Sequence, residues 1–346
     1  SDGTCTANIT NKPNRNLIIN GAMNVAQRGT SSTSTGYQTV DRFNGSYTGT
    51  DEAPTFSQAD VASGTTPYTS GFRKSFKITN GNQTSGAGAA DKIQIYYGVE
   101  DQDLATSGWN YTSASSFVTL SFWVKSSVAQ NFYGFFQSDN GSQYRYPFET
   151  GSLSADTWTK VTKTIAGNSN IVLNNDNGVG MYINIYPFIG TDQTNNSVTL
   201  NQWMALDNTA RTPDYTSTWY TTNDATFEIT GVQLEVGSVA TDFEHRSFGQ
   251  ELALCQRYYQ IVRASLRNDY RTDNVATFGN GVNLYCEMRT SPTASTVTSV
   301  ATQDISSVGY GYISKRGFMI TGNGIATIGG TAAQQAVRDV GLAAEL

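Results

Sequence analysis

The feature that most constrains the fold is a series of short segments in which apolar and polar residues alternate, separated by turns rich in Gly and Asn. The clearest runs from Phe117 to Ser126, where Val118, Leu120, Phe122 and Val124 fall on one side. A period of two is the pattern of a β-strand with one buried face. Because these segments do not alternate with helical ones, they predict an all-β fold, a β-sandwich or jelly roll.

Other segments of the same kind surround this strand. They lie at Phe72 to Ile78, Lys92 to Val99, Asn131 to Gln137, Gln143 to Phe148, Thr157 to Ile165, Gly180 to Ile189 and Phe227 to Glu235. The apolar run from Asn16 to Ala22 predicts a first strand that ends in a turn at Asn20-Gly21. We assign residues 16–246 to one jelly-roll domain.

A helix is predicted after this domain. Ser247 and Gln250 have the spacing of a capping box, in which each side chain bonds the other residue's backbone N–H. Phe248, Leu252, Cys255, Tyr259 and Val262 then recur at spacings of 4, 3, 4 and 3 residues. This heptad spacing predicts an amphipathic connecting helix over residues 247–263, which packs either on its own chain or on copies of itself.

Residues 264–346 are predicted to form a small C-terminal β domain, the distal tip of the chain. Its strands are expected at Val275 to Met288, Ala294 to Val300, Gly309 to Ser314 and Gly317 to Ile328. A domain of this size buries a small fraction of its surface on folding, so trimerisation would supply the missing core.

Composition narrows the functional classes. Charged residues are 14% of the chain, against roughly 25% in ordinary globular domains. The net charge of −6 argues against a nucleic-acid partner, and no apolar run reaches the length of a membrane span. Such a composition is typical of an all-β extracellular or virion protein, and it equally fits a β-rich secreted domain. The polar, Asn-rich residues 1–15 are expected to be a linker to an upstream region.

The three cysteines do not predict a disulfide framework or a zinc site. Cys5, Cys255 and Cys286 are odd in number and include no C-x-x-C spacing. Three thiols fit assembly in a reducing cytoplasm.

No catalytic arrangement is evident, and we predict that the chain is not an enzyme. The one histidine, His245, has no nucleophile motif near it and is expected to be structural. A glycosidase needs two carboxylates at a set separation, and no sequence rule pairs the acidic clusters. Glu235 is expected to anchor the turn that follows its strand.

Calcium is the one cofactor for which the sequence offers candidate ligands. Glu100, Asp101 and Asp103 could contribute two or three oxygen ligands. No D-x-D-x-D-G loop is present, however, so a solvated acidic loop is the favoured interpretation and no cofactor is predicted.

Binding through aromatic platforms is better supported than catalysis, since sugars present apolar C–H faces to aromatic rings. Each ring could instead be a packing residue, because sandwich cores use aromatics heavily. Tyr144, Tyr146, Tyr182 and Tyr186 are secondary candidates. The preferred ligand-binding candidates are Trp109, Tyr111, Trp123, Trp219 and Tyr220 in the first domain, and Tyr310 and Tyr312 in the second.

Several segments resemble a known family. The run VQLEVGSVATDFEHRSFGQELALCQRYYQ resembles a segment of bacteriophage tail-fibre and receptor-binding proteins, and RNLIINGAMNVAQRGT, VDRFNG, EMRTSPT and the final AEL agree with it. LSFWVKSS and DTWTKVTKTI resemble two strands of jelly-roll carbohydrate-binding modules. The tail-fibre resemblance implies a homotrimeric virion fibre tip, assembled in the host cytoplasm. Such a tip would contact other virion tail proteins on its N-terminal side and a host surface glycan or protein.

Two other functions remain open at this point. One is a purely structural fibre or collar protein whose surfaces contact only virion proteins. The other is a glycan-degrading tailspike, which would need paired carboxylates in a groove.

Overall fold

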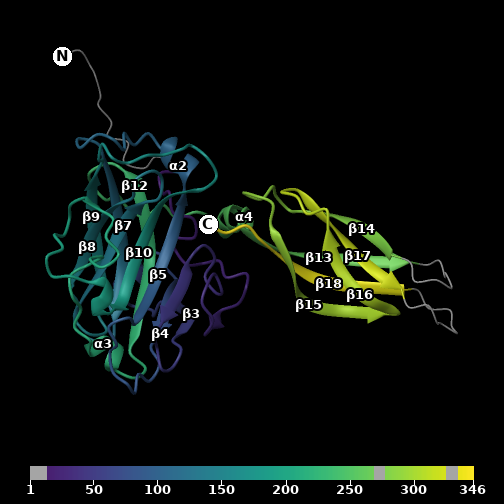
Figure 1. Ribbon diagram of the computed structural model, residues 1–346, viewed down its shortest axis with the longest axis horizontal. Coiled ribbons are helices and arrows are strands. Elements are labelled where there is room, and N and C mark those ends of the chain that lie inside the picture. Colours follow the sequence, from purple (N-terminus) through teal and green to yellow (C-terminus); the bar gives the residue numbers. More distant parts are fainter. Residues whose placement is uncertain (1–13, 269–276, 325–333) are drawn as a thin grey trace, which may run out of the picture. The chain divides into compact units, whose positions relative to one another are not determined.

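The computed structural model describes residues 14–268, 277–324 and 334–346, and the chain divides into two compact units. The first comprises residues 1–251 with Leu346, and the second comprises residues 252–345. Both are built of β-strands with few helices, as Figure 1 shows, so the predicted all-β class is confirmed. The division falls inside the predicted connecting helix.

The first unit is a sandwich of two six-stranded sheets whose named strands all pair antiparallel. In spatial order the first sheet contains β1 (Ser31–Ser32), β3 (Thr55–Asp60), β4 (Lys74–Thr79), β12 (Thr226–Val236), β6 (Phe117–Ser126) and β9 (Thr159–Ala166). The second contains β11 (Met204–Ala205), β8 (Tyr144–Ser152), β7 (Asn131–Ser138), β10 (Val179–Ile189), β5 (Lys92–Glu100) and β2 (Asn44–Thr48). The connections carry three short helices, α1 (Thr66–Thr69), α2 (Asp101–Ala105) and α3 (Thr218–Thr221), and one 3-10 turn at Thr191–Gln193.

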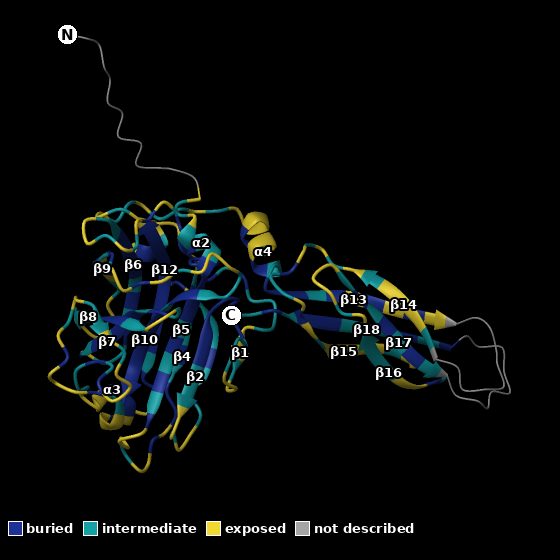
Figure 2. Ribbon diagram, turned by 45° about the horizontal axis from the view of Figure 1, so that its top comes forward, coloured by how far each residue is buried: buried dark blue, intermediate teal, exposed yellow. Residues whose placement is uncertain are grey.

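The core of this unit lies between the two sheets, where the predicted alternation places it. Phe122 and Val124 of β6 are fully buried, and so is Phe132 of β7 from the opposite sheet. The Phe132 ring meets that of Phe227 edge to face, with 4.9 Å between centroids. Strand interiors are accordingly buried and the connecting loops exposed (Figure 2).

One local expectation for this unit is corrected and one irregularity is explained. The predicted turn at Asn20-Gly21 is present, with Asn20 at a left-handed φ of 62° and its side chain bonded to the backbone of Val25, but the apolar residues before it do not form a strand. In β12 the pairing with β6 shifts register between Thr230 and Gln233, around Gly231 with φ of 63°. This bulge changes which parity faces the core, and it explains the imperfect alternation of the sequence there.

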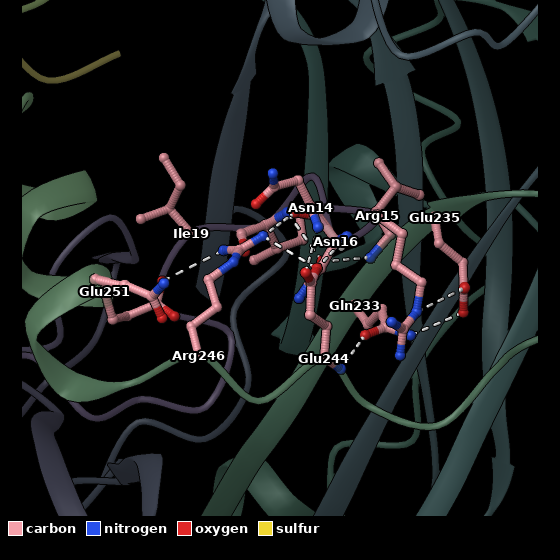
Figure 3. A network of polar contacts seen from close by, with 12 residues as sticks. Asn14, Arg15, Asn16, Ile19, Gln233, Glu235, Glu244, Arg246 and Glu251 are labelled. Carbon is pink, nitrogen blue, oxygen red and sulfur yellow. Dashed lines mark hydrogen bonds and ion pairs between the residues drawn. The ribbon is translucent and has the colours of Figure 1, made fainter. Parts of the chain in front are cut away.

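A partly buried polar network joins the first described residues of the chain to its last segment in this unit (Figure 3). The Glu244 carboxylate accepts hydrogen bonds from the backbone N–H groups of Asn14 and Asn16. The Arg246 guanidinium donates to the carbonyl oxygens of Asn16 and Ile18. It also lies 3.4 Å from Glu244 Oε2 and 3.6 Å from Glu251 Oε1. Arg246 therefore contacts two carboxylates and the N-terminal backbone at once.

Strand β12 completes this network. The Asn16 side chain accepts from the N–H of Leu234 at 3.1 Å and donates to the carbonyl of Val232 at 3.2 Å. Arg15 Nε lies 3.6 Å from Glu235 Oε2. Residues 14 and 15 thus belong to the sandwich rather than to a linker.

The second unit contains two three-stranded antiparallel sheets. One is ordered β13 (Tyr259–Asn268), β18 (Gln334–Ala343), β15 (Thr293–Gln303), and the other β14 (Thr277–Asn283), β17 (Gly317–Gly324), β16 (Ile305–Gly311). Their apolar residues form a separate core that includes Leu266, Phe318, Ile320 and Val340. The second unit is therefore an all-β unit with a core of its own, in the region where the sequence predicts a small C-terminal β domain. The predicted strand ends at residues 275–276 and 325–328 lie outside the described residues.

The connecting helix is shorter than predicted. Helix α4 (Phe248–Gln256) begins with the expected capping box, since the Gln250 N–H donates to Ser247 Oγ and the Ser247 N–H to Gln250 Oε1. Residues 259–263, predicted to be helical, instead begin β13, which pairs with β18 along ten residues. Val262, Ala264 and Leu266 are buried at every second position, so a strand period overrides the heptad spacing there. Phe248, the first residue of the predicted seam, is 59% exposed.

Cys255 is a buried thiol and Cys286 a partly buried one, whereas Cys5 lies outside the described residues. Within the described ranges, no helix has the length and apolar character needed to cross a membrane.

Candidate functional site

The outer face of the second sheet is hollowed into a groove with a volume of about 280 Å³. The alternation of β5 puts Ile93 and Ile95 into the core and turns Lys92, Gln94 and Tyr96 outward into this groove. Strands β10, β7 and β8 add their outward residues, and the connection after β11 closes one side. The volume is close to the lower end of the range for small-molecule sites, roughly 300–1,000 Å³.

Aromatic rings and amides make up most of the lining. The rings are those of Tyr96, Phe135, Tyr182 and Tyr186. The amides are those of Gln94, Gln137, Gln143, Asn184 and Asn208. This combination offers apolar faces for stacking beside donors and acceptors for hydroxyl groups.

Strand register sets the positions of these side chains. Tyr96 is paired across the sheet with Asn184, and Asn184 with Phe135. In the next row, Tyr182 is opposite Gln137 and Gln137 is opposite Arg145. Side chains on paired strands lie about 5 Å apart, so the two rows form a continuous surface.

Tyr96 and Tyr182 are the half-buried rings of the groove. Their rings meet edge to face with 6.1 Å between centroids, and the Tyr96 hydroxyl accepts a 2.7 Å hydrogen bond from the Asn44 side chain. Burial, with the nearby charge of Asp139, raises the pKa of Tyr182 to about 12. The Tyr182 phenol is therefore neutral at pH 7, and the ring–ring contact and the Asn44 hydrogen bond hold the two ring faces in place.

Arg145 forms part of the floor of the groove. It is only 1% exposed, and its guanidinium carbon lies 4.2 Å from the centroid of the Phe135 ring. It donates to Gln137 Oε1 at 3.0 and 3.3 Å and to the Asp207 carbonyl at 3.0 Å. Burial lowers the pKa of Arg145 to about 10, so it remains a cation at pH 7.

Three of the predicted platform residues are core residues. Trp109 is 3% exposed, and Trp219 and Tyr220 are fully buried. Trp219 lies in the single turn α3 and donates its indole N–H to the Thr226 carbonyl, while the Tyr220 hydroxyl bonds Asp91. Rings in these positions stabilise the sandwich and do not offer the exposed surface that their Ser- and Thr-rich surroundings suggested.

The other four candidates are dispersed. Tyr111 packs against the core, and Trp123 lies half-buried on the outer face of the first sheet, beside a cluster that includes Phe72. In the second unit, Tyr310 packs edge to face on Phe318 and its hydroxyl bonds Thr296. Tyr312 is 85% exposed, with a left-handed φ of 50°. The structure does not bring these seven residues together.

The acidic candidates for calcium are mostly used by the fold. Asp101 is fully buried at the start of α2, and its Oδ2 accepts from the Asn174 N–H at 2.7 Å and from the Asn140 side chain. Glu100 is 1% exposed and Asp103 is partly buried. Among the residues that the structure describes, no group of three or more His, Cys, Asp or Glu side chains is placed to hold a metal.

His245 and Glu235 have the structural contacts expected of them. The His245 ring bonds the carbonyl of Ser70 at 2.9 Å and packs on Phe72. Both oxygens of the Glu235 carboxylate accept from Thr241, in the turn that follows β12.

Most of the groove was not predicted as a site, although the sequence carries a signal for part of it. Tyr182 and Tyr186 were secondary candidates, and Tyr182 proves to be a half-buried lining residue while Tyr186 is buried at its base. The strand that contains Lys92, Gln94 and Tyr96 was predicted correctly, and these three residues occupy its alternate, outward-facing positions. Arg145 and Arg211 come from separate segments that only the folded sheet brings together. The remaining secondary candidates differ: Tyr146 is in the core and Tyr144 is half-buried.

Comparison with known proteins gives only remote likenesses. The structure is similar to the enzymatically active domain of bacteriophage CBA120 tailspike protein 4, with 11% identity, a TM-score of 0.35, and coverage of 65% of this chain and 22% of that one. It is similar to a putative sugar-binding protein from Bacteroides thetaiotaomicron, with 12% identity, a TM-score of 0.33, and coverage of 64% and 100%. It is also similar to the N-terminal cellulose-binding domain of a Cellulomonas fimi β-1,4-glucanase, with 10% identity, a TM-score of 0.29, and coverage of 63% and 99%. No protein-family model and no curated protein sequence matches the chain.

Proposed function

We propose that this chain is a glycan-binding protein of a bacteriophage tail fibre, which adsorbs to the host cell surface through the groove on the second sheet. The observation that carries the proposal is the juxtaposition of the Tyr96 and Tyr182 rings with five amide side chains in that groove. Pyranose rings have apolar faces and hydroxyl edges, and this surface has a partner for each.

The groove also favours binding over hydrolysis. A glycosidase needs two carboxyl groups about 5–9.5 Å apart, and no Asp or Glu is among the described residues that line the groove. We therefore place the chain with adhesive rather than glycan-degrading fibre proteins.

The fibre assignment adds expectations that the sequence resemblance suggests. We propose a homotrimer located in the virion, assembled in the host cytoplasm and joined to other tail proteins on its N-terminal side. Three grooves on one particle would bind by avidity, so that each site can be weak while the virion is held firmly.

The test measures binding of the labelled chain to a panel of bacterial cells and purified surface polysaccharides. Tyr96→Ala and Tyr182→Ala each remove a stacking ring, and the loss of such a binding residue costs about 2 kcal/mol, or roughly 30-fold in Kd. Tyr312→Ala is the matched control, since it removes a more exposed tyrosine in the second unit. Loss of binding in the control alone would move the site to the second unit. Unaltered binding in all three variants would show that the groove takes no part in adsorption.

A further inference from the structure

The groove has an unusual charge for this protein. The chain as a whole has a net charge of −6, yet among the residues that the structure describes, the charged side chains lining the groove are all basic: Lys92, Arg145 and Arg211. They come from β5, from β8 and from the connection after β11, so their convergence is a property of the fold rather than of one basic segment.

None of the three cations has a carboxylate partner within the described part of the chain. Arg145 donates to an amide and a carbonyl oxygen, both of them neutral. Arg211 donates to the Tyr186 hydroxyl at 3.4 Å and to Asn208 Oδ1 at 3.1 Å, and its buried Nε has no hydrogen-bond partner. Lys92 makes no ion pair within 4.0 Å there, in contrast to Lys125, which lies 3.0 Å from Glu228 on the other sheet.

Two acidic residues close to the groove, Asp207 and Asp139, have hydrogen-bond donors of their own. Asp207 is exposed, and its carboxylate accepts hydrogen bonds from the N–H and hydroxyl of Thr209. Asp139 lies toward the Tyr182 end of the groove and accepts from Gln143. The end that contains Lys92 and Arg211 therefore keeps an uncompensated positive charge.

The charge of Arg211 also destabilises the charged forms of Lys92 and Arg145. Burial, and then the charge of Arg211, lowers the pKa of Lys92. Burial, and to a lesser degree the charge of Arg211, also lowers the pKa of Arg145, whereas Tyr186 and the carboxylate of Asp207 act in the opposite direction. Charged side chains that are removed from water are normally paired, because an unpaired one loses its hydration without compensation. An anion placed between these three groups would supply the missing partner.

We infer that the groove is specific for an acidic glycan, with an anionic substituent of the sugar placed against Lys92 and Arg211 and its ring against Tyr96 and Tyr182. The inference rests on the proposed glycan-binding function and adds the class of ligand. A carboxylate or a sulfate ester satisfies the same donors, since Arg offers a planar fork of N–H groups to either.

The experiment compares polymers that differ only in charge. Polygalacturonate, alginate and hyaluronan are each presented beside their carboxyl-reduced, neutral forms, and dextran sulfate is presented beside dextran. We expect the full chain to bind at least one native acidic polymer, and its neutral form at least tenfold more weakly. Affinity for the acidic polymer should fall as salt is raised from 50 to 500 mM, because added ions screen charge pairs.

Variants then assign the effect to the groove. Lys92→Gln with Arg211→Gln should weaken binding of the acidic polymer at least tenfold and remove its salt dependence. Lys160→Gln is the matched control, an exposed lysine on β9 of the other sheet. It should bind as the wild type does.

The possible results separate the two proposals. Equal binding of acidic and neutral polymers that is lost in Tyr96→Ala would overturn the acidic preference and leave glycan binding intact. Binding of neutral polymers alone would do the same. Failure of every polymer to bind, or binding that neither Tyr96→Ala nor the charge variants affect, would overturn both.

Discussion

Replacement of Arg246 by Ala should destabilise the first unit by about 3 kcal/mol. The substitution leaves the carboxylates of Glu244 and Glu251, which are 11% and 7% exposed, without their shared cation. Removal of one partner of a buried ion pair costs about 3–5 kcal/mol. We take the lower end because the N–H groups of Asn14, Asn16 and Asn20 still donate to the two carboxylates.

Tryptophan fluorescence during urea unfolding reports this change selectively. All five tryptophans, Trp109, Trp123, Trp158, Trp203 and Trp219, belong to the first unit, so the signal follows the sandwich and not the second unit. For a domain of this size, a loss of about 3 kcal/mol lowers Tm by roughly 6–12 °C.

Arg263→Ala is the control for this measurement. Arg263 is 65% exposed and pairs with Asp339 on the surface of the second unit. Its removal should leave the tryptophan transition unchanged, since exposed ion pairs contribute little. A loss below about 1 kcal/mol for Arg246→Ala would show that the network is solvated and does not hold the chain ends together, which would refute the reasoning.

Three further changes test the backbone and the charges, each by calorimetry on the full chain. Gly231→Ala should destabilise the first unit by about 1–3 kcal/mol, because φ is 63° and the new Cβ would lie 2.6 Å from a Phe72 ring carbon; Gly249→Ala, with no atom within 4 Å of the new Cβ in α4, should be neutral or stabilising. Ser247→Ala should cost about 1 kcal/mol through loss of the helix cap, and no loss would mean that Gln250 alone caps the helix. Burial raises the folded-state pKa of Glu251 above its ordinary 4.5, so ionisation of this carboxyl group opposes folding. Relative to Glu251→Gln, the wild type should therefore lose stability as pH rises from about 4.5 through the folded-state pKa. A gain in stability over that range would contradict the assignment.

The sandwich could be predicted because its strands depend on local pattern. The strand at Phe117–Ser126 was predicted with its observed ends, since apolar residues occupy every second position from Val118 to Val124. The turn at Asn20 was predicted, but the apolar residues before it were wrongly assigned to a strand, since apolar content alone does not separate a strand from a buried irregular segment. The start of β13 was missed because Tyr259 and Val262 continue a heptad spacing, while the pairing with β18 that decides its conformation is more than seventy residues away.

The site was harder to predict because exposure is a property of the whole fold. Trp219 lies among Ser and Thr residues, the usual surroundings of an exposed ring, but α3 turns it onto Phe132 and Phe227. The groove needs four strands from three separate parts of the sequence, and the register between them sets which side chains become neighbours. The alternation in the sequence indicates which residues of β5 face outward. It does not indicate the strand order β8-β7-β10-β5 that brings them together with the residues of the other strands.

The polar network has a mechanical consequence for a protein that is pulled at its ends. The chain enters the first unit at Asn14 to Asn16 and leaves it near Arg246, and these two segments are bonded directly to each other. A tensile force along the chain would be transmitted across those short bonds and would bypass the two sheets. The sandwich would then remain folded under a force applied between these two segments until the Arg246 contacts rupture.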